Sequence, residues 1–291
     1  MNEARPIATR FLRRRADRRA LVFLAVTSSL YVIHWLAGAS AHWLLIPSAV
    51  LAVSICAIKH NHIHGSMFRS PALNRSLNVW LACLTGTSTT GIRMAHNQRH
   101  HRHNQSPEDH VRCSLVWRQS AFVAFIGFCP LVIAETWRHA RQDTVRIHAK
   151  SVSLHRLRMV EQAAIWILIC AGLLLDWRQF LWVFPVPWLF GQWFMITINL
   201  LQHDGLGADD PLLGSRNVVG TWCNWLFFNN GYHTAHHLHP ALHWSLLPAY
   251  HRQHIGPHLP PELESRSLRG LVEDWWKARS LTRTFASEQT A

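Results

Sequence analysis

Histidine is the residue type whose number and spacing point to chemistry in this chain of 291 residues. There are 22 histidines, more than the 16 aspartates and glutamates combined, and many lie in short clusters. The clusters have the spacings H-x3-H, H-x3-H-H and H-x2-H-H, and an N-x3-H element lies between the last two. Residues three or four apart share one face of a helix, so each cluster can direct its side chains at one metal ion. The clustered residues are His60 and His64; His96, His100 and His101; Asn199 and His203; and His233, His236 and His237.

The clustered histidines predict a metal centre with nitrogen ligands. Imidazole is a good ligand for iron, copper, zinc and nickel. Nine clustered histidines are too many for one ion and fit two metals with four or five nitrogens each. A zinc hydrolase site usually takes three protein ligands, and the six dispersed cysteines include no C-x-x-C pair. A dinuclear, nitrogen-rich site therefore favours iron and O2 chemistry, and the alternative is a set of solvated histidines that bind metal adventitiously.

Other residues near the clusters are candidates for supporting the ligands. Ligating imidazoles usually donate their second N–H to a carboxylate or a carbonyl. We expect Asp204 to support the ligands, and we expect Glu108 and Asp109 to be solvated loop carboxylates. His62 lies about 200° around a helix from its neighbour two residues before, so it is predicted to point away from the metal.

The elements that position these clusters are predicted to be membrane helices. Hydrophobic residues make up 49% of the chain and charged residues only 15%, where a soluble domain carries roughly 25% charged residues. Four apolar runs each come close to the roughly 20 residues that cross the hydrocarbon core, and short turns join them in two pairs. The runs are residues 20–38, 43–58, 160–177 and 180–201. The sequence predicts an all-α integral membrane protein with four transmembrane helices in two hairpins, as one domain over residues 1–291.

Basic residues indicate how these spans are oriented. Residues 1–19 hold seven arginines against two acids, and residues 135–158 hold six Lys and Arg against two acids. Cytoplasmic loops carry such an excess, so both ends, the central loop and the polar tail at 257–291 are predicted to be cytoplasmic. Residues 121–134 are apolar but only 14 long and contain Pro130, so we expect an interfacial or re-entrant segment there. Every histidine cluster then lies in a cytoplasmic, His-rich helical cap.

The net charge of +13 has more than one explanation. In a soluble protein it would suggest nucleic acid binding, but a nucleic acid binder has no need of four apolar spans, and we expect no nucleic acid partner. On the cytoplasmic face of a membrane protein, the basic excess can attract anionic lipid, an acyl carrier or an acidic electron donor.

The order of the clusters, with a pair of spans between the second and the third, resembles the integral-membrane fatty acid desaturase and hydroxylase superfamily. The resemblance covers about residues 20–255, and the context NNGYHTAHHLHPALHWSLLP is most similar to small bacterial members such as dihydrorhizobitoxine desaturases. The resemblance implies a di-iron centre whose ligands are the histidines of the three clusters, namely His60, His64, His96, His100, His101, His233, His236 and His237. Asn199 and His203 match an N-x3-H element of acyl-CoA desaturases, in which the histidine binds iron and the asparagine acts through water.

The same resemblance implies an enzyme of the bacterial inner membrane that uses O2 and external electrons to desaturate the aliphatic chain of a fatty-acyl or lipid-like substrate. The chain has no H-P-G-G motif of a fused cytochrome b5, so we expect a separate electron donor of the ferredoxin, rubredoxin or cytochrome b5 type. One alternative is a di-iron hydroxylase or ketolase on a similar substrate. Another is a His-rich membrane metal transporter, which would need ionisable ligands inside the spans rather than at their ends.

Overall fold

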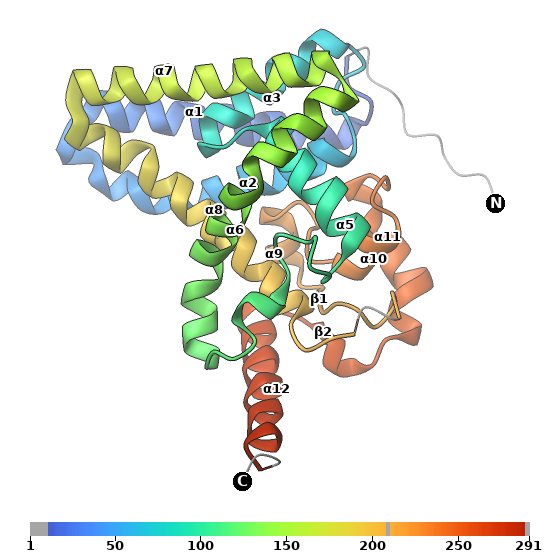
Figure 1. Cartoon of the computed structure of the whole chain (residues 1–291). Coiled ribbons are helices and arrows are strands. Elements are labelled where there is room, and N and C mark those ends of the chain that lie inside the picture. Colours follow the sequence, from blue (N-terminus) through green and yellow to red (C-terminus); the bar gives the residue numbers. More distant parts are fainter. Residues whose placement is uncertain (1–10, 208–209, 289–291) are drawn as a thin grey trace. The chain divides into compact units, whose positions relative to one another are not determined.

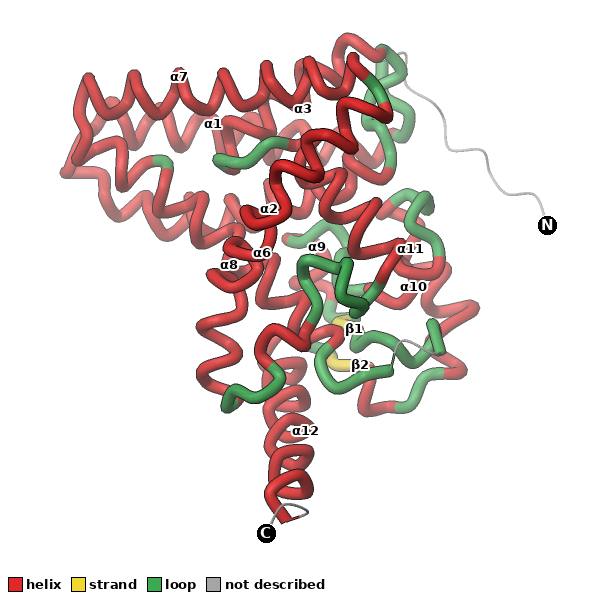
Figure 2. The backbone as a smooth tube through the Cα atoms, viewed as in Figure 1, coloured by secondary structure: helices red, strands yellow, loops and turns green. Residues whose placement is uncertain are grey.

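The computed structural model describes residues 11–207 and 210–288, so the first ten residues of the predicted basic N-terminus lie outside the described part. The chain forms two compact units, one from Met1–Met94 and Gln142–Gln192 and the other from Ala95–Arg141 and Trp193–Ala291. The described residues are mostly helical, and their two strands, β1 (Asn217–Val218) and β2 (Glu264–Ser265), form one short parallel pair (Figure 2). The predicted all-α class is confirmed, and the predicted single domain stays a prediction.

Two helices of the first unit carry the first predicted pair of spans. The run at 20–38 lies on α1, the run at 43–58 lies on α2, and the two helices pack against each other. Between them, Gly38 takes a φ of 65° and Ala41 leaves the helical region, so the chain turns back (Figure 1). The elements of this unit are η1 (Arg15–Asp17), α1 (Arg18–Ala37), η2 (Gly38–Leu44), α2 (Leu45–His64), α3 (Pro71–Thr85), α4 (Thr89–Arg93) and α7 (Val152–Val183).

The second predicted pair of runs lies on α7 and α8 (Pro185–His203). The short turn predicted between these two runs is present as a break inside α7, where Asp176 has φ −159° and ψ 94°. Its Oδ1 accepts hydrogen bonds from the backbone N–H of Arg178 at 3.1 Å and of Gln179 at 3.0 Å. This carboxylate thus caps a new helical turn, as an N-cap aspartate does.

Three helical stretches of the described residues are long and apolar enough to cross a membrane. They are Arg15–His64, Ala121–Lys150 and Val152–His203. The first contains both predicted spans of the first pair, and the third contains both of the second pair.

The structure corrects the prediction for residues 121–158. Helix α6 (Ala121–Lys150) is continuous for 30 residues, with Pro130 inside it, where we expected a short apolar segment followed by a basic loop. The interfacial or re-entrant location of residues 121–134 stays a prediction. The apolar run ends near Glu135, but the helix continues to Lys150, and Arg138 pairs with Glu135 along it at 2.8 Å. Only Ser151 separates α6 from α7, and its side chain caps α7.

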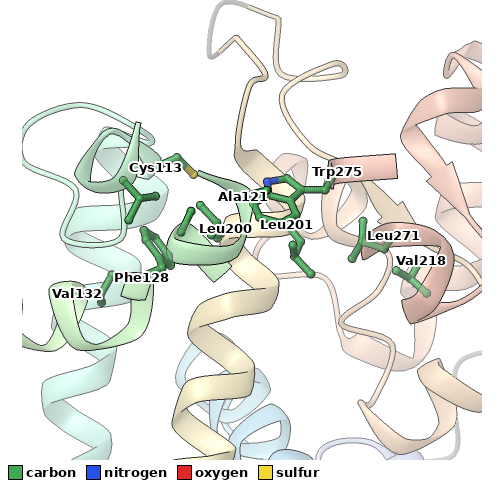
Figure 3. Close-up of a cluster of buried hydrophobic side chains, with 11 residues drawn as sticks. Cys113, Ala121, Phe128, Val132, Leu200, Leu201, Val218, Leu271 and Trp275 are labelled. Atoms are coloured by element: carbon green, nitrogen blue, oxygen red, sulfur yellow. The ribbon is translucent and has the colours of Figure 1, made fainter. Parts of the chain in front are cut away.

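The core of the second unit joins α6, the end of α8 and α12 (Leu268–Glu288). Figure 3 shows Phe128 of α6, Leu200 and Leu201 of α8, and Leu271 and Trp275 of α12 in one buried cluster. The predicted polar tail is therefore a packed helix over much of its length. The remaining elements are η3 (Met94–His100), α5 (His101–His103), η4 (Cys113–Val116), α9 (Thr221–Leu226), α10 (His233–Leu238), η5 (Trp244–Leu246), α11 (Leu247–Tyr250), η6 (His251–Ile255), η7 (Gly256–His258) and η8 (Pro261–Leu263).

Candidate metal centre

The second histidine cluster of the sequence lies on a π-helix, η3, which runs directly into α5. In a π-helix the repeat is i to i+5 instead of i to i+4. His96 consequently faces His101, with 3.0 Å between their Nε2 atoms. The structure thus pairs His96 with His101, whereas α-helical spacing would have directed His96 and His100 at one metal.

Four histidines of the second unit form the first candidate ligand set. Their ligand nitrogens all lie within 4.8 Å of one another. The Nε2 atom of His237 is 3.2 Å from that of His100 and 3.2 Å from that of His203, and the Nε2 atoms of His203 and His233 are 2.9 Å apart. We call His100, His203, His233 and His237 the four-histidine cluster.

The outer nitrogens of two of these rings fix their orientation. His100 Nδ1 is 2.9 Å from Asp109 Oδ2, and His203 Nδ1 is 2.9 Å from the carbonyl oxygen of Gly214. An ionised carboxylate and a carbonyl can only accept a hydrogen bond, so both Nδ1 atoms carry the proton and both Nε2 atoms present a lone pair. Lone pairs that converge on one point repel unless a cation lies between them. The four-histidine cluster therefore fits a metal ion bound by imidazole nitrogen.

The ionisation states of nearby groups agree with a metal site. Burial and the surrounding imidazoles of His233, His203 and His100 lower the pKa of His237 well below its usual value, which keeps the ring in the neutral form that binds metal. Burial would raise the pKa of Asp109, but His100 and the backbone N–H groups of Val111 and Gln105 outweigh burial and lower it. Asp109 is therefore an ionised acceptor for the ring of His100.

Three further histidines of the second unit form a second set, which we call the three-histidine cluster. His101 Nε2 is 3.0 Å from His96 Nε2 and 3.0 Å from His236 Nε2. The rings of His101 and His237 stack with centroids 4.5 Å apart, so the two clusters are neighbours. Each adjacent pair, His100 with His101 and His236 with His237, supplies one ring to each cluster. Adjacent residues of a helix point about 100° apart. The two rings of each pair can therefore face two neighbouring metal sites.

Helix α10, which carries His233, His236 and His237, is held by hydrogen bonds to Ser215 and to Asn217 of β1. The hydroxyl of Thr234 is 2.8 Å from Ser215 Oγ and accepts from Asn217 Nδ2 at 2.8 Å. Asn217 Oδ1 also accepts from the backbone N–H of Thr234 at 3.0 Å. These contacts are fully buried, so α10 is held firmly at the two histidine clusters that it serves.

The first histidine cluster of the sequence lies in the first unit. His60 and His64 share one face of α2, as predicted, with ring centroids 5.0 Å apart. His62 points away, also as predicted, because its Nε2 pairs with Asn78 Oδ1 at 2.9 Å and its Nδ1 accepts from the backbone N–H of Met67 at 3.3 Å.

The structure changes the expected roles of two acids. Asp109 is fully buried against His100, whereas we expected a solvated carboxylate. Asp204 contacts Trp275 and Arg279 of α12, whereas we expected it to support a ligand. Glu108 is exposed, as predicted.

Asn199 is buried, and its Nδ2 donates to the carbonyl oxygen of Val111 at 3.4 Å. It thus contacts the segment that carries Asp109, and its predicted action through water stays a prediction.

The sequence could not have identified the carbonyl of Gly214, since any residue has one. For Asp109 the sequence signal was weak, because it is an aspartate nine residues after His100 with no helical spacing to connect the two. The chain turns back between them, where Gln105 takes a φ of 61°. Two further histidines follow α10 in the chain and have partners outside the two histidine clusters. His239 pairs with Tyr250 at 2.6 Å, and His251 pairs with Glu264 at 2.7 Å.

The comparisons with known proteins give one result. A family model for fatty acid desaturases matches residues 33–265 of this chain. Neither a curated protein nor a solved structure gives a significant match.

Proposed function

This chain belongs to the fatty acid desaturase family, and we propose that it is a membrane di-iron oxidoreductase. In this proposal the enzyme uses O2 and external electrons to introduce a double bond into the aliphatic chain of a fatty-acyl or lipid-like substrate. The observation that carries the proposal is the convergence of Nε2 atoms in the four-histidine cluster, with Asp109 and Gly214 holding the outer nitrogens of two of its rings.

The two neighbouring clusters provide places for two iron ions. His100, His203, His233 and His237 would hold one ion. His96, His101 and His236 would hold the other, and we assign His60 and His64 to that second ion from the sequence pattern. When bound, the iron pair supplies the oxidising power that removes hydrogen from an unactivated C–H bond with O2.

The protein's own contribution is to orient the ligands and to exclude water. Asp109 and the Gly214 carbonyl keep two rings in the tautomer that presents Nε2. His100 has no exposed surface, and His203 and His236 are 2% and 3% exposed. His96, His101 and His237 are partly exposed, so the burial of the other rings limits the access of water, which would otherwise take part in side reactions, to one side of the clusters.

We propose four spans with both ends in the cytoplasm, and a parity argument supports an even number of crossings between the second and the third histidine clusters. His100 and His237 lie before and after the stretches Ala121–Lys150 and Val152–His203, yet their Nε2 atoms are 3.2 Å apart. The chain between them must cross the membrane an even number of times. The stretch Val152–His203 crosses twice if it turns at Asp176, which leaves α6 on the cytoplasmic surface. We propose the bacterial inner membrane as the location.

The electron donor in this proposal is a separate protein of the ferredoxin, rubredoxin or cytochrome b5 type. Acidic donors of this kind and anionic acyl carriers are attracted by a basic cytoplasmic face, and the chain carries 29 Lys and Arg against 16 acids.

The test compares two buried histidines that differ only in the predicted role. His203→Gln removes a ligand, whereas His62→Gln changes a ring that pairs with Asn78 and Met67. We expect two irons per chain in the wild type and in His62→Gln. For His203→Gln we expect a loss larger than the roughly 10–100-fold effect of changing an outer hydrogen-bond partner. Lipid extracts of expressing cells should contain new double bonds only where iron is retained.

Several outcomes would contradict the proposal. Stoichiometric zinc with no activity after iron reconstitution would exclude an iron oxygenase. Full iron and turnover in His203→Gln, with loss of both in His62→Gln, would overturn the ligand assignment. Hydroxylated products without alkenes would identify a hydroxylase.

A further inference from the structure

Helix α12 contacts the residue that directly follows a proposed ligand. Asp204 comes after His203, and its Oδ2 accepts a hydrogen bond from the indole N–H of Trp275 at 2.8 Å. The same oxygen accepts from the guanidinium of Arg279, whose side chain is 7% exposed. Charge-assisted hydrogen bonds of this kind are among the strongest in proteins.

The other end of the same guanidinium binds a different segment. Arg279 Nη2 donates to the carbonyl oxygens of Val116 and of Gln119, the latter at 3.0 Å. This segment follows closely after Asp109, the carboxylate that orients His100. One arginine thus joins the two chain segments that support His203 and His100.

Apolar contacts accompany this polar junction. Leu271 and Trp275 have no exposed surface and pack in the cluster that contains Leu200 and Leu201, which lie within one helical turn of His203 (Figure 3). The matched part of the family model ends at residue 265, and α12 begins at Leu268. The helix that fixes this end of α8 therefore lies outside the segment that identifies the family.

We infer that α12 is a positioning element of the metal centre, and that Arg279, through Asp204 and the 116–119 carbonyls, keeps the four-histidine cluster in its binding geometry. The inference rests on the proposed function, because it assumes that this cluster binds iron. Removing one partner of a buried ion pair leaves an uncompensated charge and shifts the local backbone. Such a shift would move His203 and Asp109 relative to each other.

The experiment uses the full-length, detergent-purified protein and measures iron per chain and the rate of iron loss to excess chelator. Arg279→Ala is compared with Arg269→Ala, which removes the same charge from the same helix. Arg269 forms only an exposed pair with Glu273, and its side chain is 88% exposed. We expect Arg269→Ala to match the wild type and Arg279→Ala to lose iron about 10-fold faster or more, the range typical of outer supports of ligands.

Two further variants keep the inference testable if Arg279→Ala does not fold. Trp275→Phe keeps the aromatic packing but removes the hydrogen bond to Asp204, and we expect faster iron loss from a folded protein. Arg279→Lys keeps the charge but not the planar fork that reaches two segments, and we expect partial recovery.

The outcomes separate the inference from the proposed function. If wild type and Arg269→Ala hold no iron, the proposed function fails and this inference with it. If both hold two irons while Arg279→Ala and Trp275→Phe release iron at the wild-type rate, the role of α12 is wrong and the proposed function stands.

Discussion

At the scale of single residues, the outer nitrogen of each ligand matters as much as the nitrogen that faces the metal. A neutral histidine carries a proton on one ring nitrogen and a lone pair for metal binding on the other. The hydrogen-bond partner of the outer nitrogen decides which nitrogen is protonated. For His100 this partner is Asp109, and for His203 it is a backbone carbonyl. Only the first can be removed by mutation.

We predict that Asp109→Asn weakens iron binding about 10–100-fold without unfolding the protein. An amide can present its NH2 group to His100 and stabilise the wrong tautomer, in which the proton sits on Nε2. The measurement is iron stoichiometry after dialysis against a chelator.

Glu108→Gln is the matched control, since it removes the same charge one residue earlier from an exposed side chain. Equal iron content in the two variants would mean that Asp109 has no part in orienting His100.

At the scale of elements, the sequence predicted which histidines cluster but not how they divide between two sites. The spacing of His60 and His64 transfers directly to structure because α2 is a regular α-helix. The division of His96, His100 and His101 depends on the π-helix, and the sequence MAHNQRH contains no proline or glycine to mark it. Helix α6 was missed in part because the apolar run ends near Glu135, whereas the helix continues to Lys150.

The loop before α10 offers a test at this scale. Gly231 lies two residues before His233, and a Cβ atom there would come within 2.2 Å of the carbonyl oxygen of Val218 and 2.7 Å of Asn224 Oδ1. Since the first of these atoms belongs to the backbone, the loop itself must move. We predict that Gly231→Ala destabilises the protein by about 1–3 kcal/mol, as overpacking does, and lowers iron content by displacing His233.

Gly65→Ala is the control for this change, because Gly65 directly follows His64 and a Cβ atom there meets nothing within 4 Å. Thermal unfolding and iron analysis of both variants check the prediction. A Gly231→Ala protein with wild-type stability and iron would show that the loop tolerates the shift.

At the scale of the whole molecule, the positions of the clusters in the chain constrain the membrane topology more tightly than hydropathy does. Hydropathy leaves three candidate stretches, and α6 is one of them. The 3.2 Å distance between His100 and His237 requires both to be on one side of the membrane. An α6 that crossed would give three crossings between them and separate the two residues.

Single cysteines in a background without the six native ones test this topology directly. The chosen sites, Ser66, Glu108, Ala241 and Arg178, are all exposed in the structure, so labelling depends only on the side of the membrane. We predict that cysteines at 66, 108 and 241 react with a membrane-impermeant maleimide only after the cells are opened. A cysteine at 178, beside the break in α7, should react in intact cells whose outer membrane has been made permeable. If 108 and 241 label from opposite sides, α6 crosses the membrane, the four-histidine cluster cannot form, and the di-iron proposal fails at its structural basis.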